Sequence, residues 1–430
     1  MMQPVKLASR FNVWAIFALA LLIRWGAFYF FYFVYKTPGG GILSPTADEV
    51  YELLARDMLG TRSLQMGFFA YRPPLLPMFI ALVYIITGTH SPLAASFVYT
   101  FVSAAVCLPA YAIAKELGAE EKWARMAALL TAIDPASVVG GVGLLAEAMA
   151  NLFIAASFLF LARLLKKHQL RDAVACAASM VLASLARPNA IYFAIVVAAL
   201  IVVFVPRWPV KAGVFLSVFV LGVLPWYVRN YAYHNLFTFA TTSDFNQLFY
   251  KAVSVEAWAT GRPPGDVQTD FAYELDRRLG VAGPRETYDY KSIWRHLVPS
   301  DPQANRIMRE MAVRVYLAHP LTYIVLIPVT LVKLLAFSDP LKVFGSLKWF
   351  ELAFNIGFYG LAAVGGFAFW KRREWISLAI TLLPIVYFLA VPVASGGIQD
   401  TRVRTNVTVC FAIMAAEGIG GLWRRRHDRK

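Results

Sequence analysis

The chain has 430 residues, of which 59% are hydrophobic, 15% aromatic and only 16% charged. A soluble domain usually carries about 25% charged residues, so this composition excludes an ordinary soluble enzyme and indicates that lipid surrounds most of the chain. The net charge of +15 does not indicate nucleic acid, because Lys and Arg gather in short loops, as they do on the cytoplasmic side of membrane proteins.

Apolar runs of roughly twenty residues follow one another along the chain, and an α-helix needs about that length to cross the hydrocarbon layer. Backbone amides must be paired inside lipid, so these runs predict helices. We therefore predict an all-α integral membrane fold, one polytopic bundle over residues 1–430 with 10–12 transmembrane helices. The ten spans that we expect are 11–35, 92–114, 123–146, 147–165, 172–186, 190–206, 212–228, 348–370, 375–393 and 405–423.

The basic loops predict the orientation of these spans. If every cluster of Lys and Arg is cytoplasmic, ten spans place both termini inside the cell and make the protein a multi-pass component of the inner or plasma membrane. The clusters are Lys6 with Arg10, 115–125, 163–171, 207–211, 371–373 and 424–430.

Two shorter apolar stretches, 74–88 and 321–337, do not fit this alternation. The first opens with Pro73 and Pro74, and the second contains Pro328 and Lys333. We expect each to be a re-entrant or membrane-surface helix at the outer face, where protein or water covers the backbone. If both instead cross the bilayer, the number of spans is twelve.

Two long segments then lie outside. Residues 36–91 form a first outer loop with surface helices, and residues 229–347 form a large outer loop that ends in the re-entrant or additional segment 321–337. The three cysteines are far apart within apolar runs, so the spacing indicates neither disulfides nor a metal site. We expect no cofactor, and no pattern supports a divalent metal.

Acidic and basic side chains gather at the predicted outer boundary. Asp48 and Glu49 follow the first span and precede an amphipathic stretch, where carboxylates also suit a helix N-terminus. Arginines at such boundaries either reach lipid head groups or bind a phosphate with the planar guanidinium. The other candidates are Arg72, Glu147, Arg187, Asn189, Arg229, Asn230, Arg402 and Arg404.

The order of these residues resembles the GT-C glycosyltransferases, most closely the family 39 group, with protein O-mannosyltransferases, aminoarabinose transferases and lipopolysaccharide-core sugar transferases among its relatives. The resemblance runs from about residue 11 to 423, and the chain departs from it where Thr405 and Asn406 replace a usual Pro. The segments that carry it are Asp48-Glu49 with Tyr51, Arg72-Pro73-Pro74, Leu144-Leu145-Ala146-Glu147, Ala186-Arg187-Pro188-Asn189, Leu224-Pro225-Trp226-Tyr227-Val228-Arg229-Asn230-Tyr231 and Asp400-Thr401-Arg402-Val403-Arg404.

The resemblance implies a GT-C fold and a transfer reaction. A sugar would pass from a polyprenyl-phosphate lipid to a glycan, lipid or protein acceptor at the outer or periplasmic face. Asp48 would be the base that deprotonates the acceptor, Glu49 would share or orient that role, and the remaining candidates would contact substrate. The alternatives are a transporter or flippase of a lipid-linked substrate, which commonly shows internal repeats, and a non-catalytic relative.

Overall fold

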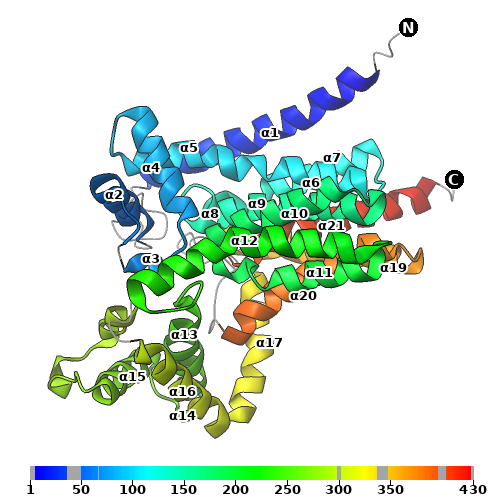
Figure 1. Ribbon diagram of the computed structural model, residues 1–430. Coiled ribbons are helices and arrows are strands. Elements are labelled where there is room, and N and C mark those ends of the chain that lie inside the picture. Colours follow the sequence, from blue (N-terminus) through cyan, green and yellow to red (C-terminus); the bar gives the residue numbers. More distant parts are fainter. Residues whose placement is uncertain are drawn as a thin grey trace.

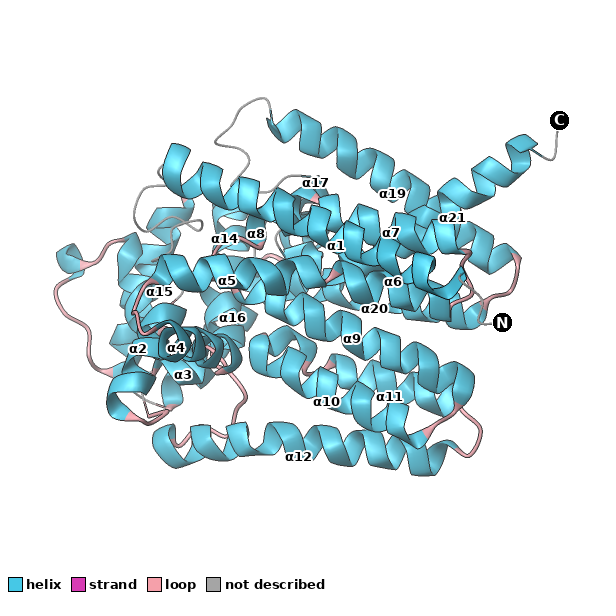
Figure 2. Cartoon of the chain, turned by 90° about the horizontal axis from the view of Figure 1, so that it is seen from above, coloured by secondary structure: helices cyan, strands magenta, loops and turns pink. Residues whose placement is uncertain are grey.

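The computed structural model describes residues 5–35, 50–65, 67–297, 302–336, 347–395 and 403–427, which contain helices and turns but no strand. Eleven of these helices run side by side as a bundle (Figures 1 and 2). They are α1 (Val5–Tyr29), α5 (Pro92–Ala105), α6 (Cys107–Glu116), α7 (Glu121–Ile133), α9 (Ala146–Lys167), α10 (Leu170–Ala186), α11 (Phe193–Phe204), α12 (Trp208–His234), α19 (Leu347–Lys371), α20 (Trp375–Ser395) and α21 (Thr408–His427).

In the described part of the chain, seven helical segments have the length and apolarity of membrane spans. The predicted fold class, a polytopic helical bundle, is thereby confirmed. The shorter or more polar α7, α10 and α11 lie in the same bundle, where α10 packs along α9 and α12. The seven segments are Val13–Val34, Pro92–Glu116, Ala146–Lys167, Trp208–His234, Lys348–Lys371, Trp375–Ala394 and Val403–Arg424.

The expected span 123–146 is not one helix. Helix α7 ends at Ile133, and a short helix α8 (Pro135–Gly140) follows. The Asp134 carboxylate accepts a hydrogen bond from the Ser137 amide and so caps α8, while Pro135 occupies the first helical position. An N-cap acid followed by Pro is a helix-start signal, and it overrides the apolar run around it.

Helices α4 (Leu75–Thr87) and α17 (Pro320–Ala336) run across the bundle axis instead of along it (Figures 1 and 2). Helix α17 follows α16 (Gln303–Ala318) with a bend of 99°. Such a direction suits the surface or re-entrant position expected for these stretches. Their depth in a bilayer stays a prediction.

Both termini lie at one end of the bundle, and α2 (Tyr51–Thr61), α3 (Phe68–Tyr71) and α4 lie at the other (Figure 1). The segment after α12 adds a helical subdomain beside them (Figure 1). It contains α13 (Thr242–Asn246), η3 (Gln247–Ala252), α14 (Val253–Thr260), α15 (Pro264–Leu279), η4 (Arg285–Thr287), η5 (Tyr290–His296) and α16.

This subdomain has an apolar core of its own. Phe245, Phe249, Leu275 and Met308 are fully buried in it. The Tyr288 hydroxyl donates to the buried Asp276 carboxylate at 2.6 Å. The subdomain is therefore a packed unit beside the end of the bundle that carries α2, α3 and α4, and not an extended loop.

The arrangement predicts which positions an impermeant thiol reagent reaches in intact cells. The native Cys107, Cys176 and Cys410 are buried, so background labelling should be low. If the subdomain is outside as expected, Thr260→Cys, exposed in it, should be labelled, whereas Gln169→Cys, exposed in the α9–α10 turn near the termini, should be labelled only after permeabilisation. Labelling of Gln169→Cys but not Thr260→Cys in intact cells would show that the orientation in the membrane is opposite to the predicted one.

Candidate functional site

A cavity of about 180 Å³ lies at the end of the bundle that carries α2 and α3, where segments far apart in sequence meet. The contributing elements are the start of α2, the end of α3, η2 (Pro188–Ala190), the segment 238–246, the end of α20 and η6 (Val403–Val407). Three residues predicted from the sequence line it, namely Arg72, Arg187 and Asn189. The other polar lining residues are Tyr51, Tyr192, Thr238, Thr242, Ser243 and Asn246.

Arg187 reaches the cavity because α10 stops just before it. The following Pro188 disfavours helical backbone at Arg187, which is extended, with φ −140° and ψ 129°. Its Nη1 lies 2.9 Å from Oε1 of Glu147, which is only 3% exposed in the first turn of α9. The Tyr387 hydroxyl on α20 donates to the Asn189 carbonyl at 2.9 Å. Three helices thus fix this corner of the cavity.

Arg72 approaches the cavity from the segment between α3 and α4. It follows α3 in extended backbone before Pro73. Its guanidinium carbon lies 4.6 Å from the centre of the Tyr71 ring and 5.3 Å from that of Tyr51, within range of a cation–π attraction. The aromatic rings hold the position of the guanidinium without neutralising its charge.

These contacts give the cavity a definite chemistry. Two guanidinium groups, hydroxyls and side-chain amides face a space that is partly apolar through Val391 and Pro392. Arginine pairs well with oxyanions because its planar fork donates two parallel hydrogen bonds. Glu147 offsets part of the charge of Arg187 and sets its direction. The arrangement is suited to an anionic group joined to a polar or weakly apolar body.

Three of the predicted site residues, Asp48, Glu49 and Arg402, lie outside the described residues. Their neighbours in the sequence do line the cavity: Tyr51 follows Asp48 by three positions, and Val403 follows Arg402 directly. The roles expected for these three residues stay predictions.

Arg229 and Asn230 lie beside the cavity and are not among its lining residues. The Arg229 guanidinium donates to the Leu64 carbonyl at 2.8 Å and to the Asn230 side-chain oxygen at 2.7 Å. The Asn230 amide donates to the carbonyls of Thr238 and Phe239. Asn230 therefore holds the cavity-lining segment after α12 in place, and Arg229 orients Asn230 and holds Leu64. Arg229 also lines a separate open groove of about 940 Å³ between α2, α4 and α12.

Arg404 lies inside the bundle and not at the outer boundary, where the sequence pattern had placed it. It is fully buried, and its Nη2 lies 2.8 Å from the Asp134 carboxylate and 3.0 Å from the Asn355 side-chain oxygen. Asp134 was not a candidate from the sequence. The only available signal was the Asp-Pro helix start within an apolar run, which gives no information about its partner 270 positions away.

The described residues contain no group of three or more His, Cys, Asp or Glu side chains placed to hold a metal ion. The polar groups of the cavity are thus those of arginine, amides and hydroxyls. Such groups recognise anionic and sugar-like oxygen atoms by hydrogen bonds.

The contacts of Asn230 predict a loss of stability when its side chain is removed. Asn230 is fully buried, and Asn230→Ala would leave two carbonyls and the Arg229 guanidinium without this partner. An unsatisfied buried polar group costs about 1–3 kcal/mol, so the unfolding temperature in detergent should fall. Tyr231→Phe, at an adjacent and 57% exposed position, is the control and should unfold like the wild type. Equal unfolding temperatures for all three proteins would contradict this role.

Part of the sequence matches the model of a known protein family. Residues 71–228 match the model of the dolichyl-phosphate-mannose-protein mannosyltransferase family, a range that includes Arg72, Glu147 and Arg187. No curated protein matches the chain.

Solved structures of an oligosaccharyltransferase from Archaeoglobus fulgidus have a similar fold. The apo form aligns with a TM-score of 0.57 at 15% identity, over 96% of this chain and 51% of that chain. The same enzyme, AglB, in complex with an inhibitory peptide and a dolichol-phosphate aligns with a TM-score of 0.54, at 15% identity and the same coverage. The chain thus spans about half the length of that enzyme.

The likeness extends over nearly the whole chain, although the two sequences have little identity. It confirms the fold expected from the order of motifs. The chain has the helical membrane fold of this oligosaccharyltransferase, and residues 71–228 match the dolichyl-phosphate-mannose-protein mannosyltransferase model.

Proposed function

We propose that this protein is a glycosyltransferase that moves a sugar from a polyprenyl-phosphate donor to an acceptor hydroxyl at the outer face of the membrane. The observation that carries the proposal is the convergence of Arg72 and Arg187 on one cavity at the outer end of the bundle. The AglB complex with a dolichol-phosphate supports this type of donor, because AglB has a fold similar to that of the present chain and binds such a lipid.

In the proposed reaction the two arginines bind the phosphate of the donor. When the bond between the sugar C1 and the phosphate oxygen breaks, negative charge grows on that oxygen, and fixed guanidinium groups stabilise it. Glu147 orients the Arg187 guanidinium through the contact of 2.9 Å between Oε1 and Nη1. The Tyr51 and Tyr71 rings do the same for Arg72.

The acceptor hydroxyl needs a base. We assign this role to Asp48, with Glu49 sharing or orienting it. Asp48 precedes the cavity-lining Tyr51 by three positions, a length of chain that spans at most about 11 Å. The base takes the hydroxyl proton, the acceptor oxygen bonds to C1, and polyprenyl phosphate leaves with the bonding electron pair.

The acceptor in this proposal is a hydroxyl of a glycan, a lipid or a protein at the outer surface. The side chains of Thr242, Ser243 and Asn246 line the cavity from the start of the outer subdomain. Their hydroxyl and amide groups have the hydrogen-bonding capacity that a sugar or hydroxyl acceptor requires. A transporter or a non-catalytic relative would have the same fold, and the assay of transfer separates these functions.

Substitution of Asp48 tests the base. Asp48→Asn preserves shape but accepts no proton, and general-base catalysis contributes about 10²–10⁴-fold, so transfer at saturating donor and acceptor should fall by roughly that factor. Glu49→Gln in parallel is the matched comparison. Loss of transfer only in Glu49→Gln would reverse the two roles, and full activity of both would place the base elsewhere, with Glu147 the next candidate.

Substitution of Arg187 tests the phosphate contact. Arg187→Ala should lower kcat/KM for the donor by about 10²–10³-fold, by analogy with the loss of one oxyanion-hole donor. Arg262→Ala, at an exposed outer-subdomain position paired with Asp270, should leave turnover unchanged. Normal donor use by a well-folded Arg187→Ala protein would contradict the assignment.

A further inference from the structure

Tyr99 on α5 is a fully buried tyrosine that has no role in the reaction described above. Its hydroxyl donates a hydrogen bond to the Leu145 carbonyl at 2.6 Å and accepts one from the Met149 amide at 2.9 Å. Its ring centre lies 5.5 Å from that of Phe79 on α4. Packing and hydrogen bonds thus fix the hydroxyl, which joins α5 to the first turn of α9.

The two hydrogen bonds fall at a particular place in α9. In an α-helix, the amide of each residue bonds to the carbonyl four positions before it, and Met149 stands four positions after Leu145. The Tyr99 hydroxyl bridges this carbonyl and this amide. A side chain that enters the hydrogen-bond ladder of a helix bends it at that point, so Tyr99 sets the geometry of the first turn of α9.

Helix α9 also begins without a capping side chain of its own. A Ser, Thr, Asp or Asn at the N-cap position normally accepts a hydrogen bond from an amide of the first turn. Leu145 holds that position in α9 and makes no such bond. The Tyr99 hydroxyl accepts from an amide of this turn, so α5 supplies a contact that the sequence of α9 lacks.

Glu147 lies in this turn, between the two residues that Tyr99 holds. Its Oε1 lies 2.9 Å from Nη1 of Arg187, which lines the cavity of about 180 Å³. Tyr51 and Arg187, both lining residues, also lie within electrostatic range of the Tyr99 hydroxyl. A change in the first turn of α9 therefore moves the Glu147 carboxylate and changes the direction of the Arg187 guanidinium.

We propose that Tyr99 is a positioning residue for the donor phosphate, because its hydroxyl sets the direction of the Arg187 guanidinium through Glu147. The proposal rests on the proposed function, since it requires Arg187 to bind that phosphate. In Tyr99→Phe, the Leu145 carbonyl and the Met149 amide lose their common partner and bond to each other, as in a regular helix. Neither buried group then stays unpaired, so the variant should fold, with Glu147 displaced relative to Arg187.

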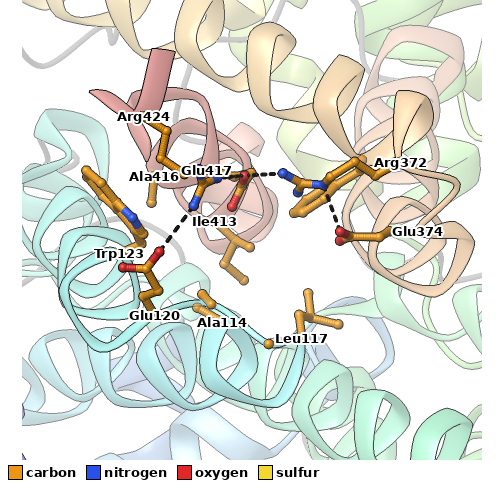
Figure 3. A pocket seen from close by; sticks show the side chains of 13 residues that line it. Ala114, Leu117, Glu120, Trp123, Arg372, Glu374, Ile413, Ala416, Glu417 and Arg424 are labelled. Carbon is orange, nitrogen blue, oxygen red and sulfur yellow. Dashed lines mark hydrogen bonds and ion pairs between the residues drawn. The ribbon is translucent and has the colours of Figure 1, made fainter. Parts of the chain in front are cut away.

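The opposite end of the bundle provides a matched control. Arg372 and Arg424 both donate there to Oε1 of Glu417, at 2.7 and 2.6 Å (Figure 3), so these charges pair with one another. At the same end the Tyr111 hydroxyl donates to the Glu121 carboxylate at 2.9 Å. Tyr111→Phe removes a hydroxyl of the same kind, but Glu121 contacts no residue of the cavity that Arg187 lines.

Binding of undecaprenyl phosphate to the full chain in detergent tests the proposal without requiring catalysis. Tyr99→Phe should raise the Kd about 10-fold, the usual effect of one lost hydrogen bond to a charged group, while Tyr111→Phe should bind as the wild type does. When Glu147 is already replaced by Ala, Tyr99→Phe should weaken binding no further, because its effect passes through Glu147. Unfolding temperatures measured without lipid control for folding.

Two results of this cycle would overturn the proposal. One is unchanged binding by Tyr99→Phe, and the other is an equal loss with and without Glu147, which a merely structural role would give. Failure of Tyr99→Phe to fold would also contradict it, because the Leu145 and Met149 backbone groups must then be unable to pair.

A transfer assay in parallel separates this proposal from the proposed function. Lipid binding that Tyr99→Phe weakens, without any transfer by the wild type, would contradict the function alone. Equal transfer by the wild type and Tyr99→Phe at limiting donor would contradict the positioning role alone. Absence of lipid binding by the wild type would contradict both.

Discussion

The constraint on which this structure depends is that a charge inside a membrane bundle needs a partner. The interior charges of the described residues meet it in different ways. Arg24 on α1 donates to the Ser103 hydroxyl at 2.7 Å and to the Ala132 carbonyl at 3.0 Å. Arg404 pairs with Asp134, and both are fully buried. A buried pair of this kind is strongly destabilised when one partner is removed, so these contacts fix how the helices meet.

The same constraint shapes the cavity that Arg72 and Arg187 line. The pair of Arg404 and Asp134 fixes η6, the first residue of which, Val403, lines the cavity. The pair of Glu147 and Arg187 joins the start of α9 to the end of α10. Asn230 holds the carbonyls of the segment after α12. Rigid helices and buried polar contacts therefore fix the positions of the Arg72 and Arg187 guanidinium groups. Fixed positive groups are what is required to stabilise charge that develops in a reaction.

Much of the fold followed from the sequence because lipid demands long apolar helices, and run length alone identifies them. The α7–α8 break at Asp134 was missed because one polar residue in an apolar run weighs little in such a count. Arg72, Arg187 and Asn189 were expected at one boundary of the bundle from the basic loops and the order of motifs, and all three line one cavity, where each adjoins a Pro near the end of a helix.

Contacts between residues far apart in the sequence could not be predicted from the sequence. Nothing in a motif containing Arg229 and Asn230 shows that both side chains turn to backbone carbonyls. The pairing of Arg404 with Asp134 likewise depends on how three helices pack, because Asn355 on α19 shares the contact. Motif order predicts which end of the bundle a residue occupies. Packing decides whether its side chain lines the cavity or bonds to buried groups that support the cavity.

We propose that Arg72 and Arg187 bind the donor phosphate. The most direct measurement is a cryo-electron microscopy structure of the protein with a bound polyprenyl phosphate. We expect phosphate density in the cavity of about 180 Å³, within hydrogen-bonding distance of both guanidiniums. Phosphate density in the groove beside Arg229, with that cavity empty, would contradict it.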